Sequence, residues 1–134
     1  MDYTFLFETC QLSESGVVDR LNDKFNNLWK KIPIEVSHEV QYHVNMIISI
    51  QEKISEYKIY LSTERDEHKR RGYKSHITRL DRQIDVHKEN LEVISKRANT
   101  RGTAITATTI MALAAISISI GKRKGKAKAK LSRK

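Results

Sequence analysis

Apolar residues recur at alternating steps of three and four along the middle of this chain, and this spacing constrains the fold more than any other feature. From residue 77 to residue 98 the alternation has no gap. Such spacing places apolar groups on one narrow stripe of an α-helix, as in the seam of a coiled coil. One Pro and five Gly among 134 residues leave few places for turns. The sequence therefore predicts an all-α protein built from a few long helices.

The spacing predicts three helical segments. The first begins near Ser13, a suitable N-cap, and ends at Pro33, which cannot continue a helix. The second extends from about Glu35 to about Arg70. Gly72 is the only glycine between positions 17 and 101, so we expect the chain to turn there before the third segment begins. An N-terminal segment, residues 1–12, precedes these helices.

A chain that folds back at Gly72 forms an antiparallel hairpin, in which the position numbers of facing residues sum to a constant. For this turn the sum is 144 or 145, which pairs Tyr57 with His87 and Ile54 with Leu91. The first helix would then dock on the hairpin, so that residues 13–100 form an elongated three-helix coiled-coil bundle. The seam residues expected in this hairpin are Ile47, Ile50, Ile54, Tyr57, Leu61, Leu80, Ile84, His87, Leu91 and Ile94.

Residues 103–121 contain no charged side chain. As a helix they would be ~28 Å long, which is close to the hydrocarbon thickness of a bilayer. The segment also contains four Thr, two Ser and five Ala, so its hydrophobicity only just meets the requirement for insertion. We expect a transmembrane helix, and the alternative is a helix buried against copies of itself in an assembly. The side chains expected to contact the membrane are Ile105, Ile110, Met111, Leu113, Ile116, Ile118 and Ile120.

Residues 122–134 form a polybasic tail without any acidic residue. The chain has a formal net charge of +9, and the tail supplies most of it. The Lys-Ala-Lys alternation predicts a disordered segment that contacts phosphates, either of anionic lipid headgroups or of nucleic acid. The other interpretation is a solubilising flank that has no specific partner. The basic residues are Lys122, Arg123, Lys124, Lys126, Lys128, Lys130, Arg133 and Lys134.

The two C-terminal segments conflict with the ordinary routes to a membrane. The excess of positive charge after residue 121 predicts that the C-terminus stays in the cytoplasm, yet the N-terminus lacks the pattern of a signal peptide. The opposite orientation would move eight cations across the bilayer. A protein that is delivered from outside the cell, or stored in a particle and inserted later, would avoid this conflict.

The sequence shows no pattern typical of an enzyme or of a metal or cofactor site. His38 and His43 are five residues apart and diverge by about 140° on a helix, whereas two ligands on one face need a spacing of four. Cys10 is the only cysteine, and no basic residue near it in sequence would activate its thiol. We therefore expect a non-enzymatic protein.

The primary hypothesis is a membrane-associated structural or interaction protein, anchored by residues 103–121 and the basic tail. Its bundle would self-associate into a homo-oligomer or bind a protein partner. The alternative is an internal protein of a virus or phage particle, whose tail contacts the genome and whose apolar helix serves assembly or membrane entry. A third hypothesis, a small pore-forming or lysis protein, rests on the Ser and Thr residues of the apolar segment.

Overall fold

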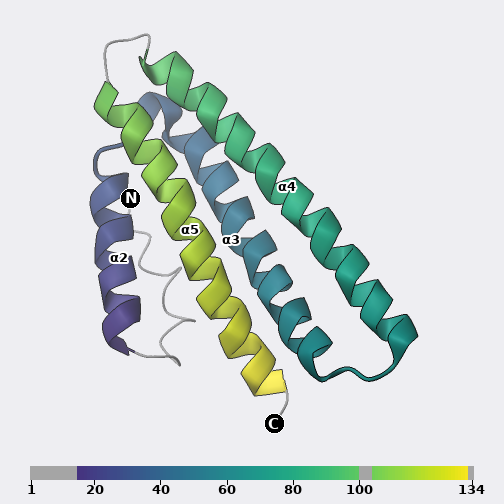
Figure 1. The fold of residues 1–134 in the computed structure, drawn as a ribbon. Coiled ribbons are helices and arrows are strands. Elements are labelled where there is room, and N and C mark those ends of the chain that lie inside the picture. The colour runs from purple at the N-terminus through teal and green to yellow at the C-terminus, as the bar shows by residue number, and fades with distance from the viewer. Residues whose placement is uncertain (1–14, 100–103, 133–134) are drawn as a thin grey trace.

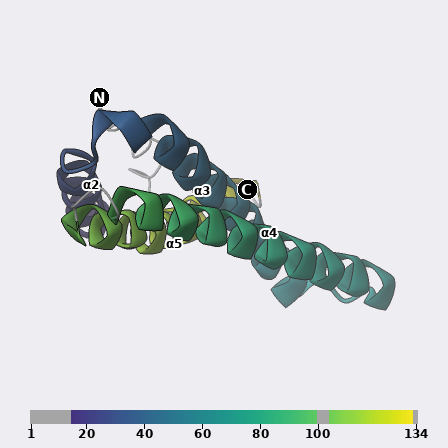
Figure 2. The same cartoon turned by 90° about the horizontal axis from the view of Figure 1, so that it is seen from above.

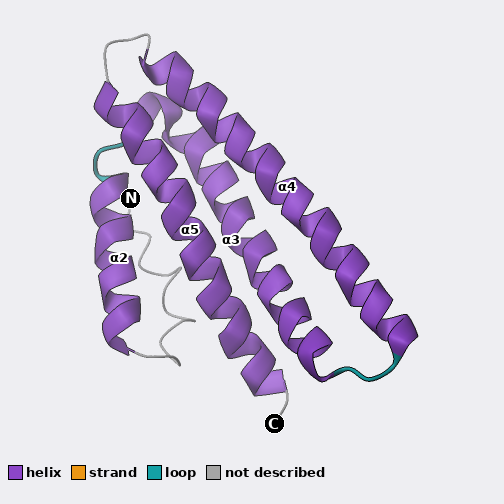
Figure 3. Cartoon of the chain, viewed as in Figure 1, coloured by secondary structure: helices purple, strands orange, loops and turns teal. Residues whose placement is uncertain are grey.

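The computed structural model describes residues 15–99 and 104–132, and within these ranges the chain forms four α-helices and no strand. The helices are α2 (Ser15–Trp29), α3 (Ile34–Thr63), α4 (Glu67–Asn99) and α5 (Ala104–Ser132), as Figures 1 and 3 show. The prediction of an all-α protein is confirmed. The predicted segment 1–12 lies outside the described residues.

The helices α3 and α4 form the predicted antiparallel hairpin, but the turn is not at Gly72. The chain leaves α3 after Thr63 and enters α4 at Glu67. Asp66 caps α4 by accepting a hydrogen bond from the backbone N–H of His68 at 3.1 Å. Gly72 lies inside α4, and a Cβ atom added there would meet nothing within 4 Å. The prediction of a turn at Gly72 is therefore wrong.

Two side-chain contacts fix the register of the hairpin. Nδ1 of His43 lies 2.9 Å from Nδ1 of His87, and the ring centroid of Tyr57 lies 5.8 Å from that of Tyr73. Both pairs have position numbers that sum to 130, about two heptads below the predicted value. A shift of two heptads leaves every seam residue on the seam and changes only its partner. The predicted pairing of Tyr57 with His87 is therefore wrong, although both residues lie between the two helices.

The helix that completes the bundle with α3 and α4 is α5, and this place had been predicted for the first helix. Figure 1 shows α5 beside α3 and running in the same direction, and α5 contacts α4 as well. The short helix α2 packs mainly against α5 on the side away from α4. Seen from above, α2 and the start of α4 lie at opposite ends of the molecule (Figure 2).

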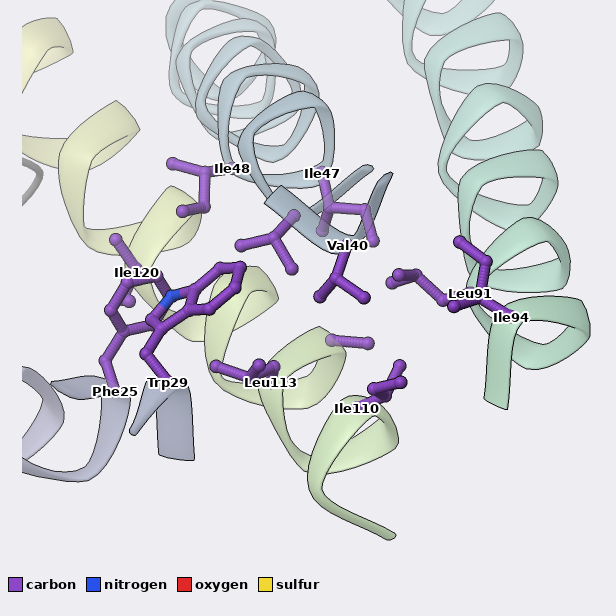
Figure 4. Close-up of a cluster of buried hydrophobic side chains, with 12 residues drawn as sticks. Phe25, Trp29, Val40, Ile47, Ile48, Leu91, Ile94, Ile110, Leu113 and Ile120 are labelled. Carbon is purple, nitrogen blue, oxygen red and sulfur yellow. The ribbon is translucent and has the colours of Figure 1, made fainter. Parts of the chain in front are cut away.

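The larger hydrophobic core draws side chains from all four helices. Figure 4 shows Phe25 and Trp29 of α2 near Ile120 of α5, and Val40 of α3 near Leu91 of α4. A second cluster lies farther along the hairpin, where the seam residues Ile50, Ile54 and Ile84 are buried. In this second cluster the seam isoleucines of α3 and α4 pack against one another, as seam residues do in a coiled coil.

In the part of the chain that the structure describes, no helix has a stretch both long and apolar enough to cross a membrane. The expectation of a transmembrane helix at residues 103–121 is therefore not supported.

Candidate polyanion interface

Most of the side chains that were predicted to contact a membrane lie inside the bundle. Ile110, Leu113 and Ile120 are at most 1% exposed. Ile116 and Ile118 are partly buried; Ile116 packs against the larger core and Ile118 against both. Met111 is 38% exposed, and the side chain of Ile105 lies outside the described residues. The uncharged part of α5 is therefore a core helix in this structure.

The basic segment is helical as far as Ser132, so the prediction of a disordered tail is wrong for residues 122–132. The reason is a row of small residues at intervals of four, which continues from the apolar part of α5 into the basic part. Its members are all buried. Residues spaced by four form one ridge of a helix, and a ridge of small side chains lets a neighbouring helix approach closely. The row consists of Ser117, Gly121, Gly125 and Ala129.

The approach is closest at the two glycines. A Cβ atom at Gly121 would lie 2.6 Å from Cβ of Gln51 and 2.7 Å from the carbonyl oxygen of Ile48. At Gly125 it would overlap the carbonyl oxygen of Glu52 and lie 2.5 Å from Cβ of Ser55. Because the overlapping atoms include backbone of α3, a side chain at either position would force the helices apart.

A buried carboxylate holds the same segment by charge. Glu52 of α3 is 7% exposed, and its Oε1 forms an ion pair with Nζ of Lys128. Nζ of Lys124 lies 3.7 Å from the other carboxylate oxygen. The hydrogen bond to Glu52 raises the pKa of Lys128; desolvation by burial opposes this in part, and the charges of Glu52 and Glu56 raise the pKa further. Glu52 thus forms ion pairs, within the protein, with two of the lysines that were predicted to contact phosphates.

Three further lysines of α5 lie at the surface in a regular arrangement. Lys122, Lys126 and Lys130 are exposed and follow one another at intervals of four residues. At 1.5 Å per residue, the row advances by ~6 Å from one lysine to the next. Arg123 is half-buried, and Arg133 and Lys134 lie outside the described residues.

The basic end of α5 lies at the same end of the bundle as the connection between α3 and α4 (Figure 1). The contacts of Gly121 with α3 and the register of the hairpin define a cationic half, which consists of residues 49–82 and 121–132. Its fifteen basic residues are Lys53, Lys58, Arg65, Lys69, Arg70, Arg71, Lys74, Arg79, Arg82, Lys122, Arg123, Lys124, Lys126, Lys128 and Lys130.

The charge of the bundle is strongly asymmetric along its length. The cationic half has six acidic residues, which gives it a formal charge of +9. The other described residues contain seven basic and seven acidic side chains and are therefore neutral. Such an asymmetry directs polyanions toward one end of a molecule. The sequence alone shows the charge of residues 122–134, whereas the excess of nine basic over six acidic residues at 49–82 joins it only because the bundle brings these segments to one end.

The cationic half also contains an aromatic cluster that the sequence analysis did not identify, formed by Tyr57, Tyr60, Tyr73 and His76. The Tyr57 ring stacks on His76 with a centroid distance of 5.3 Å and an interplanar angle of 15°. The Tyr73 ring lies 5.8 Å from Tyr57 and 6.0 Å from Tyr60. All four side chains are half-buried, so part of the cluster is open to solvent. The only sign of this cluster in the sequence was a pair of tyrosines, Tyr57 and Tyr60, one helical turn apart.

In the neutral half, His43 and His87 form the polar contact of the hairpin seam. The Tyr42 ring packs edge-on against both imidazoles, at 5.1 Å and 6.0 Å. Burial lowers the pKa of both histidines; the neighbouring His87 lowers that of His43 further, whereas Glu39 raises it. Within the described ranges, no three His, Cys, Asp or Glu side chains are grouped so as to hold a metal ion.

Comparisons with known protein families, with curated proteins and with solved structures find no match to this chain.

Proposed function

We propose that this protein is a helical bundle that binds nucleic acid through its cationic half, by contacts to phosphates that do not read base sequence. The observation that supports this most is the formal charge of +9 on one half of a bundle whose other half is neutral. Lys and Arg side chains that neutralise phosphates provide nearly all of the affinity in non-specific binding. The protein would act as a structural component that associates with a genome; this is the genome-contacting part of the alternative above, an internal protein of a virus or phage particle.

The helical state of the basic segment supports contacts to successive phosphates. A rise of ~6 Å between neighbouring lysines is close to two steps of a nucleic-acid strand at about 3.4 Å each. Lys122, Lys126 and Lys130 can therefore meet a regular row of phosphates without first ordering a flexible tail. Avoiding that loss of entropy favours binding.

Nucleic acid is favoured over an anionic membrane by the distribution of apolar side chains. A helix that lies in a membrane surface needs an exposed apolar face beside its cations. Among the described residues of the cationic half, Leu131 is the only large apolar side chain that is exposed. The apolar residues of α5 that could insert into lipid, such as Leu113 and Ile120, are buried in the bundle.

The test compares two triple variants with the same change in charge. Lys122→Gln, Lys126→Gln and Lys130→Gln together remove the exposed row of α5. Lys24→Gln, Lys30→Gln and Lys96→Gln together remove three exposed cations from the neutral half. Binding of each protein to a 20-base-pair duplex DNA is followed by fluorescence anisotropy over a range of salt concentrations.

We expect the variant of the α5 row to lower the magnitude of the log–log salt slope by about 2.7, since each phosphate contact contributes about 0.9. The control triple variant should change the slope by less than about 1. Equal effects of the two variants would contradict the proposal. So would a protein that floats with phosphatidylserine vesicles but does not bind DNA.

A further inference from the structure

We propose that the aromatic cluster of the cationic half stacks on exposed bases, so that the protein binds single-stranded nucleic acid more tightly than duplex. This inference rests on the proposed function and identifies its ligand class. The cluster lies between α3 and α4, with Tyr57 and Tyr60 on one helix and Tyr73 and His76 on the other.

The cluster is more open to solvent than the middle of the seam. The seam residues Ile50, Ile54 and Ile84 are buried. Beyond them, toward the connection of the hairpin, four rings are only half-buried and lie beside aliphatic residues such as the half-buried Leu61. An aromatic ring that keeps part of its surface in water offers an edge or face on which another flat ring can stack.

Cations surround the cluster. Lys53 and Lys69 are exposed and precede Tyr57 and Tyr73 by one helical turn, which places each lysine on the same side of its helix as the ring. Nη2 of Arg79 lies 3.0 Å from Nδ1 of His76. Rings on which bases stack, beside cations that contact the backbone, are the two elements of surfaces that bind single strands.

The acidic side chains next to the cluster are few. Glu56 precedes Tyr57 in sequence, and it also attracts Lys128 of α5. Glu64 follows Tyr60 by one turn, and its Oε1 accepts hydrogen bonds from the backbone N–H groups of Arg65 and Asp66 at 3.2 and 3.1 Å. Glu64 is thus engaged with the connection of the hairpin.

The chemistry of the cluster predicts a preference for single strands. Bases within a duplex are stacked on one another, and their faces are closed to a protein side chain. Bases of a single strand can stack on aromatic rings, and this stacking tolerates any sequence because every base has a π-face. The phosphate contacts of the α5 lysines, in contrast, are possible with both forms.

The neutral half provides a matched control. Tyr42 also lies between α3 and α4, contacts two imidazole rings and is 57% exposed. The test variant is Tyr73→Leu in the full-length protein, and the control is Tyr42→Leu. A second test variant, Tyr60→Leu, changes the side of the cluster where the Tyr60 ring lies 6.0 Å from Tyr73. Tyr73→Phe keeps the ring and removes only the hydroxyl.

Binding to labelled 20-nucleotide oligo-dT and to a duplex of equal length is measured by fluorescence anisotropy, with helicity checked by circular dichroism. We expect Tyr73→Leu to weaken binding of oligo-dT about tenfold and binding of the duplex less than about twofold. Tyr60→Leu should weaken oligo-dT binding by a smaller factor, and Tyr73→Phe and Tyr42→Leu should bind oligo-dT like the unmodified protein. The salt slope should not change in any of these variants, since none removes a cation.

The inference is wrong if the folded variants Tyr73→Leu and Tyr60→Leu both bind oligo-dT like the unmodified protein, or if they lose oligo-dT and duplex equally. In either case the phosphate contacts of the proposed function would still stand, because those are tested by the lysine variants and the salt slope. If the triple lysine variant of α5 bound DNA with an unchanged salt slope, the proposed function itself would be wrong.

Discussion

The two halves of α5 pack against the same neighbour by different means. From residue 107 to residue 120 the helix contributes aliphatic side chains to the core, of which Leu113 is fully buried. From residue 121 onward it contributes a row of small residues, and Glu52 of α3 pairs with two of its lysines. The first half gains stability from buried apolar area, whereas the second gains it from close backbone contact and ion pairs.

This difference shows why the charge of a segment does not by itself decide its state. A run of lysines would repel itself and remain unfolded if every position were exposed. In α5 the positions that face α3 are Gly and Ala, so the lysines are left on the flanks and on the outer side. The same arrangement that anchors the helix also fixes its remaining cations in the row that the proposed interface uses.

We expect the largest loss of stability from a substitution in the apolar half of α5. Leu113→Ala removes a side chain that is fully buried in the larger core. We expect a loss of about 2–5 kcal/mol in the free energy of unfolding, because the cavity cannot fully collapse. Urea unfolding followed by circular dichroism measures the loss. A loss below about 1 kcal/mol would mean that α5 does not hold its place in the core.

The small-residue row gives the next largest effect. Gly125→Ala places a Cβ atom on the backbone of α3 and should destabilise the bundle by about 1–3 kcal/mol, despite the better helix propensity of Ala.

The matched control is Gly72→Ala, since Gly72 also lies within a helix but has nothing within 4 Å of an added Cβ. This control should stabilise the protein by about 0.5–1 kcal/mol. If thermal and urea unfolding show that both substitutions stabilise the protein, α3 does not lie in close contact with the basic half of α5.

The ion pairs of the basic half should contribute less. Glu52→Gln keeps the shape of the side chain but removes the charge that faces Lys124 and Lys128. We expect a loss of about 1 kcal/mol, because the lysine partner of the shorter ion pair is 64% exposed and solvent screens it. A double-mutant cycle with Lys128→Gln isolates the contribution of this ion pair. A coupling energy indistinguishable from zero would show that Glu52 does not stabilise the packing of α5 on α3 through Lys128.

The smallest predicted effect is a pH dependence that belongs to the neutral half. Burial lowers the pKa values of His43 and His87 below the ordinary value of 6.5, so the unfolded chain binds more protons than the folded one as the pH falls through that value. The free energy of unfolding should therefore decrease on acidification and level off below the lowered pKa values. Glu39, which attracts His43 and also pairs with Arg97, reduces the effect without reversing it.

Urea midpoints at about pH 7.5 and about pH 5.5 measure this dependence. The double variant His43→Gln with His87→Gln should lose part of the decrease, whereas His68→Gln, which is exposed near the hairpin connection, should keep it. Identical pH profiles for the double variant and the unmodified protein would show that the seam histidines do not couple to folding.

The hairpin shows what periodicity can and cannot predict. The spacing placed Ile50, Ile54 and Ile84 on the stripes that face each other, and these three side chains are buried together. It could not choose among registers that differ by whole heptads, since each places the same residues on the seam. The choice depended on the turn, and Gly72 was a misleading guide because it lies within α4, where an added Cβ meets nothing within 4 Å. Asp66 was the better signal, as an N-cap residue directly before a charged helical turn.

The prediction of a disordered tail failed for a different reason. The alternation of lysines predicted disorder, and that prediction did not use the repeat of small residues at Gly121, Gly125 and Ala129, which favours helix packing on one side. The partner of that row, Glu52, lies about 70 positions earlier in the sequence, and nothing local connects the two. Likewise, the aromatic cluster requires the register of the hairpin, which the sequence did not determine.

The most direct test of this account is amide hydrogen exchange along α5, measured residue by residue by NMR in the full-length protein. The account predicts that amides from Lys122 to Lys128 exchange slowly, with protection close to that of residues 110–120, because one helix packs on α3 over its whole length. Rapid exchange beyond Gly121, with protected amides before it, would show that the basic segment is a free tail and that the fixed row of lysines does not exist.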